Sequence, residues 1–141
     1  MINGVIGNKL EVFDHTLKNL KKYLPIAFDE FQQNWGMQKI TERAIQILVE
    51  IMIDIANRFI AIKGDIPAQK SADAILKLEQ YGFIKESELY IKMIKFRNFI
   101  VHNYDALDTG ILYDILTRRL EDFEKYKNEI LSIENIWLFR T

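Results

Sequence analysis

The sequence predicts an all-α protein, an up-and-down four-helix bundle with one short additional helix. Apolar residues recur every three or four positions over long segments, which is the pattern of amphipathic helices. Only six glycines and two prolines interrupt the 141 residues, so short connections between antiparallel helices are expected. No alternating apolar and polar run is bounded by turn residues, so essentially no sheet is expected.

The N-terminal half of the chain predicts two long helices. The apolar stripe of the first helix consists of Ile2, Ile6, Leu10, Phe13, Leu17, Leu20 and Leu24. Pro25 interrupts this helix, and the stretch from Phe28 to Trp35 is expected as a kinked turn or as a loop packed on the bundle. The second helix is predicted from about Gln38 to Lys63, where Gly64 and Pro67 end it.

The C-terminal half predicts a short helix and two longer ones. The short helix begins at Ser71, a candidate N-cap, and ends at Gly82. The next helix runs from about Glu86 to Val101. Its predicted inner stripe consists of Leu89, Met93, Phe96 and Ile100. The last helix starts after Asp108, and residues 137–141 carry no clear pattern.

Composition excludes several classes of site. The chain has no cysteine, which rules out disulfides, cysteine-ligated zinc and a cysteine nucleophile. Two histidines are too few for a multi-histidine site, so no metal and no cofactor are expected. A net charge of −1 means that any phosphate binding must be local. No segment offers the ~18–20 apolar residues that span a bilayer, and the N-terminus lacks a secretory pattern, so a cytoplasmic protein with no membrane partner is expected.

One polar cluster stands out, at the predicted end of the helix that precedes Asp108. It contains Arg97, Asn98, His102 and Tyr104. At ~100° per residue, His102 shares a helix face with Asn98, and the four side chains fall within an arc of roughly 160°. Histidine exchanges protons near neutral pH, and arginine is a fixed cation with a planar fork for phosphate oxygens. Together they can support metal-free cleavage of RNA, in which the 2′-hydroxyl attacks the adjacent phosphorus.

The same residues have a structural interpretation that the pattern leaves open. A lone histidine at a helix C-terminus often caps the helix or interacts with its dipole, and Arg97 could belong to an intrahelical ion pair. Tyr104 could be an ordinary tyrosine at the edge of the core. One histidine is also few for both acid and base roles, although a two-fold dimer could place two copies of the cluster in one cleft.

The stretch from Arg97 to Tyr104 resembles the Arg-x4-His-x-Tyr signature of the HepT-like toxins, which belong to the HEPN group (higher eukaryote and prokaryote nucleotide-binding domains). The similarity extends to the segments 41–56, 71–84 and 113–116, and covers about residues 1–130 in order and length. It implies an HEPN-like fold, with one helical domain over residues 1–141. The chain departs from the family where Asn103 replaces a common acidic residue and where the region 25–36 is longer.

The resemblance also implies a function. It implies the toxin of a type VII toxin–antitoxin system, a metal-independent endoribonuclease that leaves 2′,3′-cyclic phosphate ends. Arg97 and His102 match the catalytic pair of the family, and Asn98 matches a positioning residue. Tyr104 matches the tyrosine to which a cognate minimal nucleotidyltransferase, the antitoxin, transfers AMP from ATP. The implied partners are an RNA substrate, this antitoxin and a second copy of the chain, with further assembly into larger complexes with the antitoxin.

Three further residues, Arg43, Lys95 and Asn103, are candidates for RNA contact.

Two rival functions remain beside the nuclease. One is a catalytically silent HEPN module that binds a nucleotide or docks the nucleotidyltransferase, and RNA cleavage distinguishes it from the nuclease. The other is a structural dimerising bundle, in which Arg97 and His102 point away from any shared cleft. His15, on the first predicted helix, is expected to face solvent.

Overall fold

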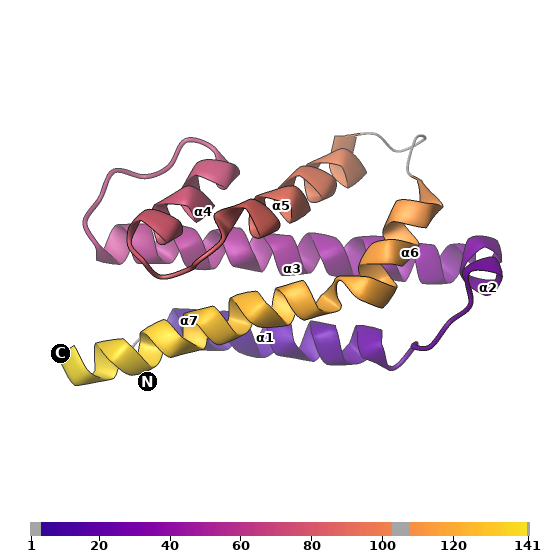
Figure 1. Cartoon of the computed structure of the whole chain (residues 1–141), viewed down its shortest axis with the longest axis horizontal. Helices are drawn as coiled ribbons and strands as arrows, with labels where there is room; N and C mark the ends of the chain where they lie inside the picture. The colour runs from indigo at the N-terminus through magenta and orange to yellow at the C-terminus, as the bar shows by residue number, and fades with distance from the viewer. Residues whose placement is uncertain (1–3, 103–107, 141) are drawn as a thin grey trace.

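The computed structural model describes residues 4–102 and 108–140 of the chain, and the side chains of residues 4–102 and 108–133. This part of the chain contains seven helices and no strand. In chain order they are α1 (Gly4–Lys21), α2 (Phe28–Gln33), α3 (Trp35–Ile62), α4 (Ser71–Gln80), α5 (Ser87–His102), α6 (Thr109–Arg118) and α7 (Leu120–Arg140). The helices α1, α3, α5 and the pair α6–α7 alternate in direction (Figure 1). The predicted up-and-down four-helix bundle is therefore confirmed.

The helix α3 is central to this bundle. It packs against α1, α2, α4, α5 and α6, while α7 lies beside α1 and contacts α5 (Figure 1). The buried apolar residues form one continuous core. Its largest fully buried side chains include Tyr90, Tyr126, Phe13, Phe31 and Phe123. Within the described ranges, no helix combines the length and the apolar character needed to cross a bilayer.

The ends of α3 and α4 confirm two predicted glycine stops. Gly64 and Gly82 adopt φ values of 71° and 79°, which suit glycine because it has no Cβ. After α3, the amide of Gly64 donates to the carbonyl of Ala61 at 3.0 Å, and the amide of Asp65 donates to Ile60 at 3.2 Å. This pair of hydrogen bonds is a Schellman motif, which satisfies carbonyls that the helix end leaves free.

The segment between α1 and α3 is more helical than the sequence indicates. It contains α2, and α3 begins at Trp35 rather than near Gln38. The side chain of Asn34 accepts a hydrogen bond from the amide of Met37 at 2.9 Å, which caps α3 one turn earlier than predicted. The Gln38 side-chain amide donates to two carbonyls at the end of α2, at 3.0 and 2.9 Å. Phe31 anchors the short helix in the core.

The predicted last helix is broken into α6 and α7 at Arg119. The hydroxyl of Thr117 donates to the carbonyl of Tyr113, one turn back, at 2.8 Å. Such back-bonding by threonine bends helices. The guanidinium of Arg119 lies 3.5 Å from Asp114 in α6 and 3.9 Å from Asp122 in α7, so it bridges the two helices across the bend.

Candidate active site

The helix α5, which carries the polar cluster, is tied to its neighbours near its first turns. The hydroxyl of Tyr90 donates to the carboxylate of Glu129 in α7, and that carboxylate also accepts the amide of Lys85 at 2.9 Å. The Tyr90 ring packs edge-on against Tyr126, with centroids 5.0 Å apart. Tyr126 in turn donates to the carbonyl of Met52 in α3 at 2.8 Å. These contacts fix α5 against both α7 and α3.

The buried face of α5 differs from the predicted stripe. Leu89 and Phe96 are only partly buried, whereas Tyr90 and Ile94 are 0% and 2% exposed. Met93 and Ile100 are buried as predicted. The prediction was wrong at the other two positions because α5 has apolar residues around most of its circumference, so the helical period alone does not identify the inner side. At ~100° per residue, the observed face is centred close to Arg97.

Arg97 therefore projects from the inner side of α5. The residue is partly buried, and its Nε atom is buried without a hydrogen-bond partner among the described residues. No carboxylate in the described part of the chain forms an ion pair with it. A buried donor without a partner typically costs ~1–3 kcal/mol, so native proteins retain few of them.

His102 and Asn98 lie on the solvent side of the same helix. Both are exposed, and they are four residues apart, so their side chains are neighbours on one face. His102 is the last residue of α5, which leaves its imidazole accessible to a ligand. Lys95 is also exposed and lies about 20° from His102 around the helix axis. The end of α5 thus presents an amide, an imidazole and an ammonium group together.

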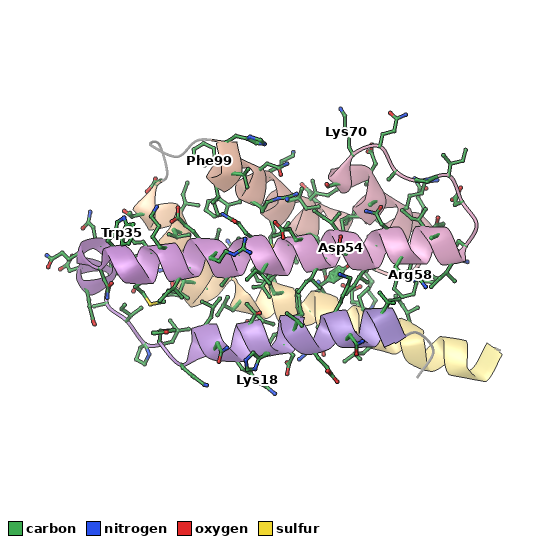
Figure 2. All side chains as sticks on the ribbon, turned by 180° about the vertical axis from the view of Figure 1, so that it is seen from behind. Lys18, Trp35, Asp54, Arg58, Lys70 and Phe99 are labelled. Carbon is green, nitrogen blue, oxygen red and sulfur yellow. The ribbon has the colours of Figure 1, made fainter. Side chains whose placement is uncertain are left out.

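An exposed aromatic ring adjoins these groups. Phe99 is 37% exposed, and Figure 2 shows it near the end of α5, on the side away from α3. A ring in this position offers a surface on which a nucleobase can stack.

The other candidate residues fall into two groups. Tyr104 and Asn103 lie outside the described residues. Arg43 is exposed on α3 and lines a groove between α1 and α3 to which α5 contributes no residue. The structure thus gathers Asn98, His102 and Lys95 on the solvent side of α5, places Arg97 on the inner side of that helix, and places Arg43 on α3. His15 is exposed, as predicted.

The structure also shows positions that sequence reasoning missed. Glu129 supports α5 from 39 positions further along the chain, and no local pattern indicates that contact. Lys22 and Lys39 line the same groove as Arg43. Within residues 4–102 and 108–133, no three histidine, aspartate or glutamate side chains gather in a way that could hold a metal ion.

Comparison with known proteins gives consistent matches over most of the chain. The family model described as "Ribonuclease HepT-like" matches residues 13–130. A tRNA nuclease HepT from Aphanizomenon flos-aquae is 25% identical over 130 residues, covering 91% of this chain and 88% of the relative. An mRNA nuclease HepT from Shewanella oneidensis is 28% identical over 127 residues, covering 89% of this chain and 95% of the relative.

Solved structures agree with these matches. A tri-AMPylated HEPN toxin from Shewanella oneidensis, in complex with an MNT antitoxin, has a TM-score of 0.85 and 28% identity. That match covers 92% of this chain and 98% of the toxin. The cytosolic protein YutE from Bacillus subtilis, of unknown function, shares the fold with a TM-score of 0.80 at 20% identity, over 94% of this chain and 90% of its own. With the family model covering residues 13–130 of the 141, this chain belongs to the HepT-like family.

Proposed function

We propose that this protein is the toxin of a type VII toxin–antitoxin system and acts as a metal-independent endoribonuclease. The observation that carries the proposal is the end of α5, where an accessible His102 lies five residues beyond an arginine whose buried Nε has no partner among the described residues. The family match and the two nuclease relatives support the same activity.

The proposed reaction uses the substrate's own nucleophile. The 2′-oxygen of a ribose forms a bond to the adjacent phosphorus, and the bond between that phosphorus and the 5′-oxygen of the next nucleotide breaks. The proton of the 2′-hydroxyl leaves and a proton arrives at the departing 5′-oxygen. The products carry a 2′,3′-cyclic phosphate and a 5′-hydroxyl.

Each site residue has a role in this reaction. His102 moves a proton, because a neutral imidazole accepts one and an imidazolium donates one near neutral pH. Arg97 stabilises the negative charge that grows on the phosphoryl oxygens. Asn98, one turn before His102, orients the histidine or the phosphate. Lys95 and Asn103 contact RNA phosphates on either side of the reacting one.

A second copy of the chain completes the site in this proposal. One histidine serves poorly as both the base and the acid of a single turnover, whereas a two-fold dimer places two histidines in one cleft.

Regulation in this proposal acts on Tyr104. A nucleotidyltransferase antitoxin transfers AMP from ATP to the tyrosine hydroxyl, with loss of pyrophosphate. Each AMP adds bulk and a negative phosphate two residues from His102, which competes with the RNA phosphate for Arg97. Support comes from the solved relative, described as a tri-AMPylated HEPN toxin bound to an MNT antitoxin.

The test is cleavage of a mixed RNA pool in EDTA by protein whose intact mass shows no AMP. We expect cleavage by the wild type and a loss of ~10²–10⁴-fold in His102→Ala, the usual contribution of a general acid or base. His102 is exposed at a helix end, so the variant should keep the wild-type melting temperature. An unmodified wild-type dimer that leaves RNA intact would contradict the proposal and favour a silent docking module.

A further inference from the structure

The groove between α1 and α3 carries a set of side chains that has no role in the chemical step proposed at α5. It has a volume of about 810 Å³, and ten residues from the end of α1, the turn after it and the start of α3 line it. Three of these are cations, Lys22, Lys39 and Arg43, and none is an acid. The whole chain has 19 basic and 20 acidic residues, so this local excess of positive charge is not a consequence of composition.

Two of the three cations are available to a ligand. Lys39 is engaged, because its ammonium lies 2.9 Å from Glu42 and 5.7 Å from the centre of the Trp35 ring. Lys22 and Arg43 are exposed, and neither has a carboxylate within ion-pairing distance in the described part of the chain. Arg43 makes one weak side-chain hydrogen bond, to Gln46 at 3.3 Å. Its guanidinium and the Lys22 ammonium can therefore bind an anionic group.

The groove also offers flat apolar surface beside these charges. Tyr23 is 47% exposed and Ile40 is 43% exposed, and both line it. An exposed aromatic ring in the same groove as two unpaired cations suits a ligand that carries both phosphates and planar bases. Proteins bind single-stranded nucleic acid in this way, by tracking the backbone with cations and stacking bases on aromatic rings.

We infer that this groove binds a single-stranded segment of the RNA substrate, next to the segment that is cut at α5. The inference rests on the proposed nuclease function and adds a second contact region to it. Figure 2 shows that Trp35, at the start of α3, and Phe99, near the end of α5, lie toward the same end of the bundle. The helix α3 lies between the groove and α5, and His102 faces solvent beyond it, so the connecting RNA crosses about two helix widths of ~10–12 Å each.

The test measures RNA binding without cleavage. The probe is a short fluorescent 2′-O-methyl oligoribonucleotide, whose blocked 2′-oxygens cannot attack phosphorus, and the readout is fluorescence anisotropy over a range of salt concentrations. For Lys22→Ala/Arg43→Ala we expect roughly tenfold weaker binding at low salt. The slope of log affinity against log salt should fall by about 1.4, since each phosphate contact on a single strand contributes ~0.7.

A matched control removes the same charges elsewhere. Arg58 and Lys70 are exposed and lie toward the other end of the bundle (Figure 2). The variant Arg58→Ala/Lys70→Ala should bind within about twofold of the wild type with an unchanged salt slope. If the control loses as much affinity as the groove variant, or if the groove variant binds like the wild type, the inference is wrong.

Stacking on Tyr23 is tested separately. Loss of one base-stacking ring typically weakens binding by about tenfold, so Tyr23→Ala should do so while Tyr23→Phe, which keeps the ring, restores binding. Equal binding by wild type and Tyr23→Ala would contradict the stacking role.

Kinetics on unmodified RNA separate this inference from the proposed function. The groove variant should raise KM by roughly tenfold and leave kcat within about twofold, because it removes binding remote from the reacting atoms. A wild type that cleaves RNA while the groove variant has an unchanged KM contradicts the groove alone. A wild type that binds through the groove and never cleaves contradicts the nuclease proposal alone.

Discussion

Arg97 and His102 project from opposite sides of α5: Arg97 from the side that faces the core, and His102 from the side that faces solvent. The Nε atom of Arg97 is buried without a partner, while His102 is exposed at the last residue of α5. Five residues of helical rise separate them by ~7.5 Å along the axis. At ~100° per residue they also leave α5 about 140° apart around its axis, so one phosphate can reach both only from the end of the helix.

Arg97 should contribute to RNA cleavage without raising the free energy of unfolding. We expect Arg97→Met, which keeps an unbranched chain and removes the unpartnered donor, to leave the free energy of unfolding equal or about 1 kcal/mol higher. RNA cleavage by the same variant should fall by ~10²–10³-fold, because the charge on the transferring phosphoryl group loses its cation. Urea unfolding and a cleavage assay measure the two effects. A clear loss of stability would instead assign Arg97 a structural role.

The Tyr90–Glu129 hydrogen bond should hold α5 in place. We expect Tyr90→Phe to lower the free energy of unfolding by about 1–2 kcal/mol, since it removes a bond to a charged acceptor and leaves Glu129 with the amide of Lys85 alone. Tyr126→Phe is the matched control: it removes an uncharged bond to the Met52 carbonyl and should cost about 1 kcal/mol. Equal stability of Tyr90→Phe and wild type in urea would show that the bond contributes nothing.

The same tyrosine should make the protein sensitive to alkali. Burial raises the pKa of Tyr90, and the hydrogen bond to Glu129 raises it further. The unfolded state therefore loses this proton first, and the stabilisation that is complete below about pH 10 is lost as pH rises beyond it. Above pH ~10, the free energy of unfolding should fall more steeply for wild type than for Tyr90→Phe. The two free energies should therefore converge as pH rises. Parallel pH profiles of the two proteins would contradict this assignment.

The ion pairs of Asp14 should make the free energy of unfolding fall in acid. Hydrogen bonds from Lys127 at 2.7 Å and Lys18 at 2.8 Å lower the pKa of its carboxyl from 3.8 to about 2. The stabilisation is present above pH ~4 and is lost as pH falls toward 2. Asp14→Asn should be less stable than wild type by up to ~1 kcal/mol near neutral pH, and the difference should vanish near pH 2. A difference between wild type and Asp14→Asn that stays constant from neutral pH to pH 2 would contradict this assignment.

Tyr113 should hold the segment before α3 against α6. Its hydroxyl donates to the carbonyl of Ile26 at 2.6 Å, and its ring lies 5.2 and 5.5 Å from the rings of Phe28 and Phe31. We expect Tyr113→Phe to cost about 1 kcal/mol and Tyr113→Ala about 3 kcal/mol in urea unfolding, because the second change also removes the packed ring. Similar losses in both variants would assign the effect to the hydrogen bond rather than to the ring.

The sequence predicts the bundle because apolar stripes such as that of α1 repeat along one helix face. Gly64 and Gly82 mark their helix ends for a similarly local reason. The break at Arg119 accompanies the back-bond of Thr117, and the early start of α3 accompanies the cap by Asn34. Neither a threonine nor an asparagine predicts such a bend or cap from its residue type alone. The spacing of Arg97 and His102 could be identified from sequence, but the burial of Arg97 could not, because it depends on how α5 rotates against α3.

The most direct test of the proposed chemistry compares an RNA oligonucleotide with a copy that carries 2′-deoxyribose at the cleaved position. Both are incubated in EDTA with unmodified wild-type protein, and mass spectrometry identifies the product ends. We expect cleavage of the all-ribose strand into 2′,3′-cyclic phosphate and 5′-hydroxyl ends, with the substituted strand intact at that position. Cleavage of both strands at the same position would contradict attack by the 2′-hydroxyl, and with it the roles proposed for Arg97 and His102.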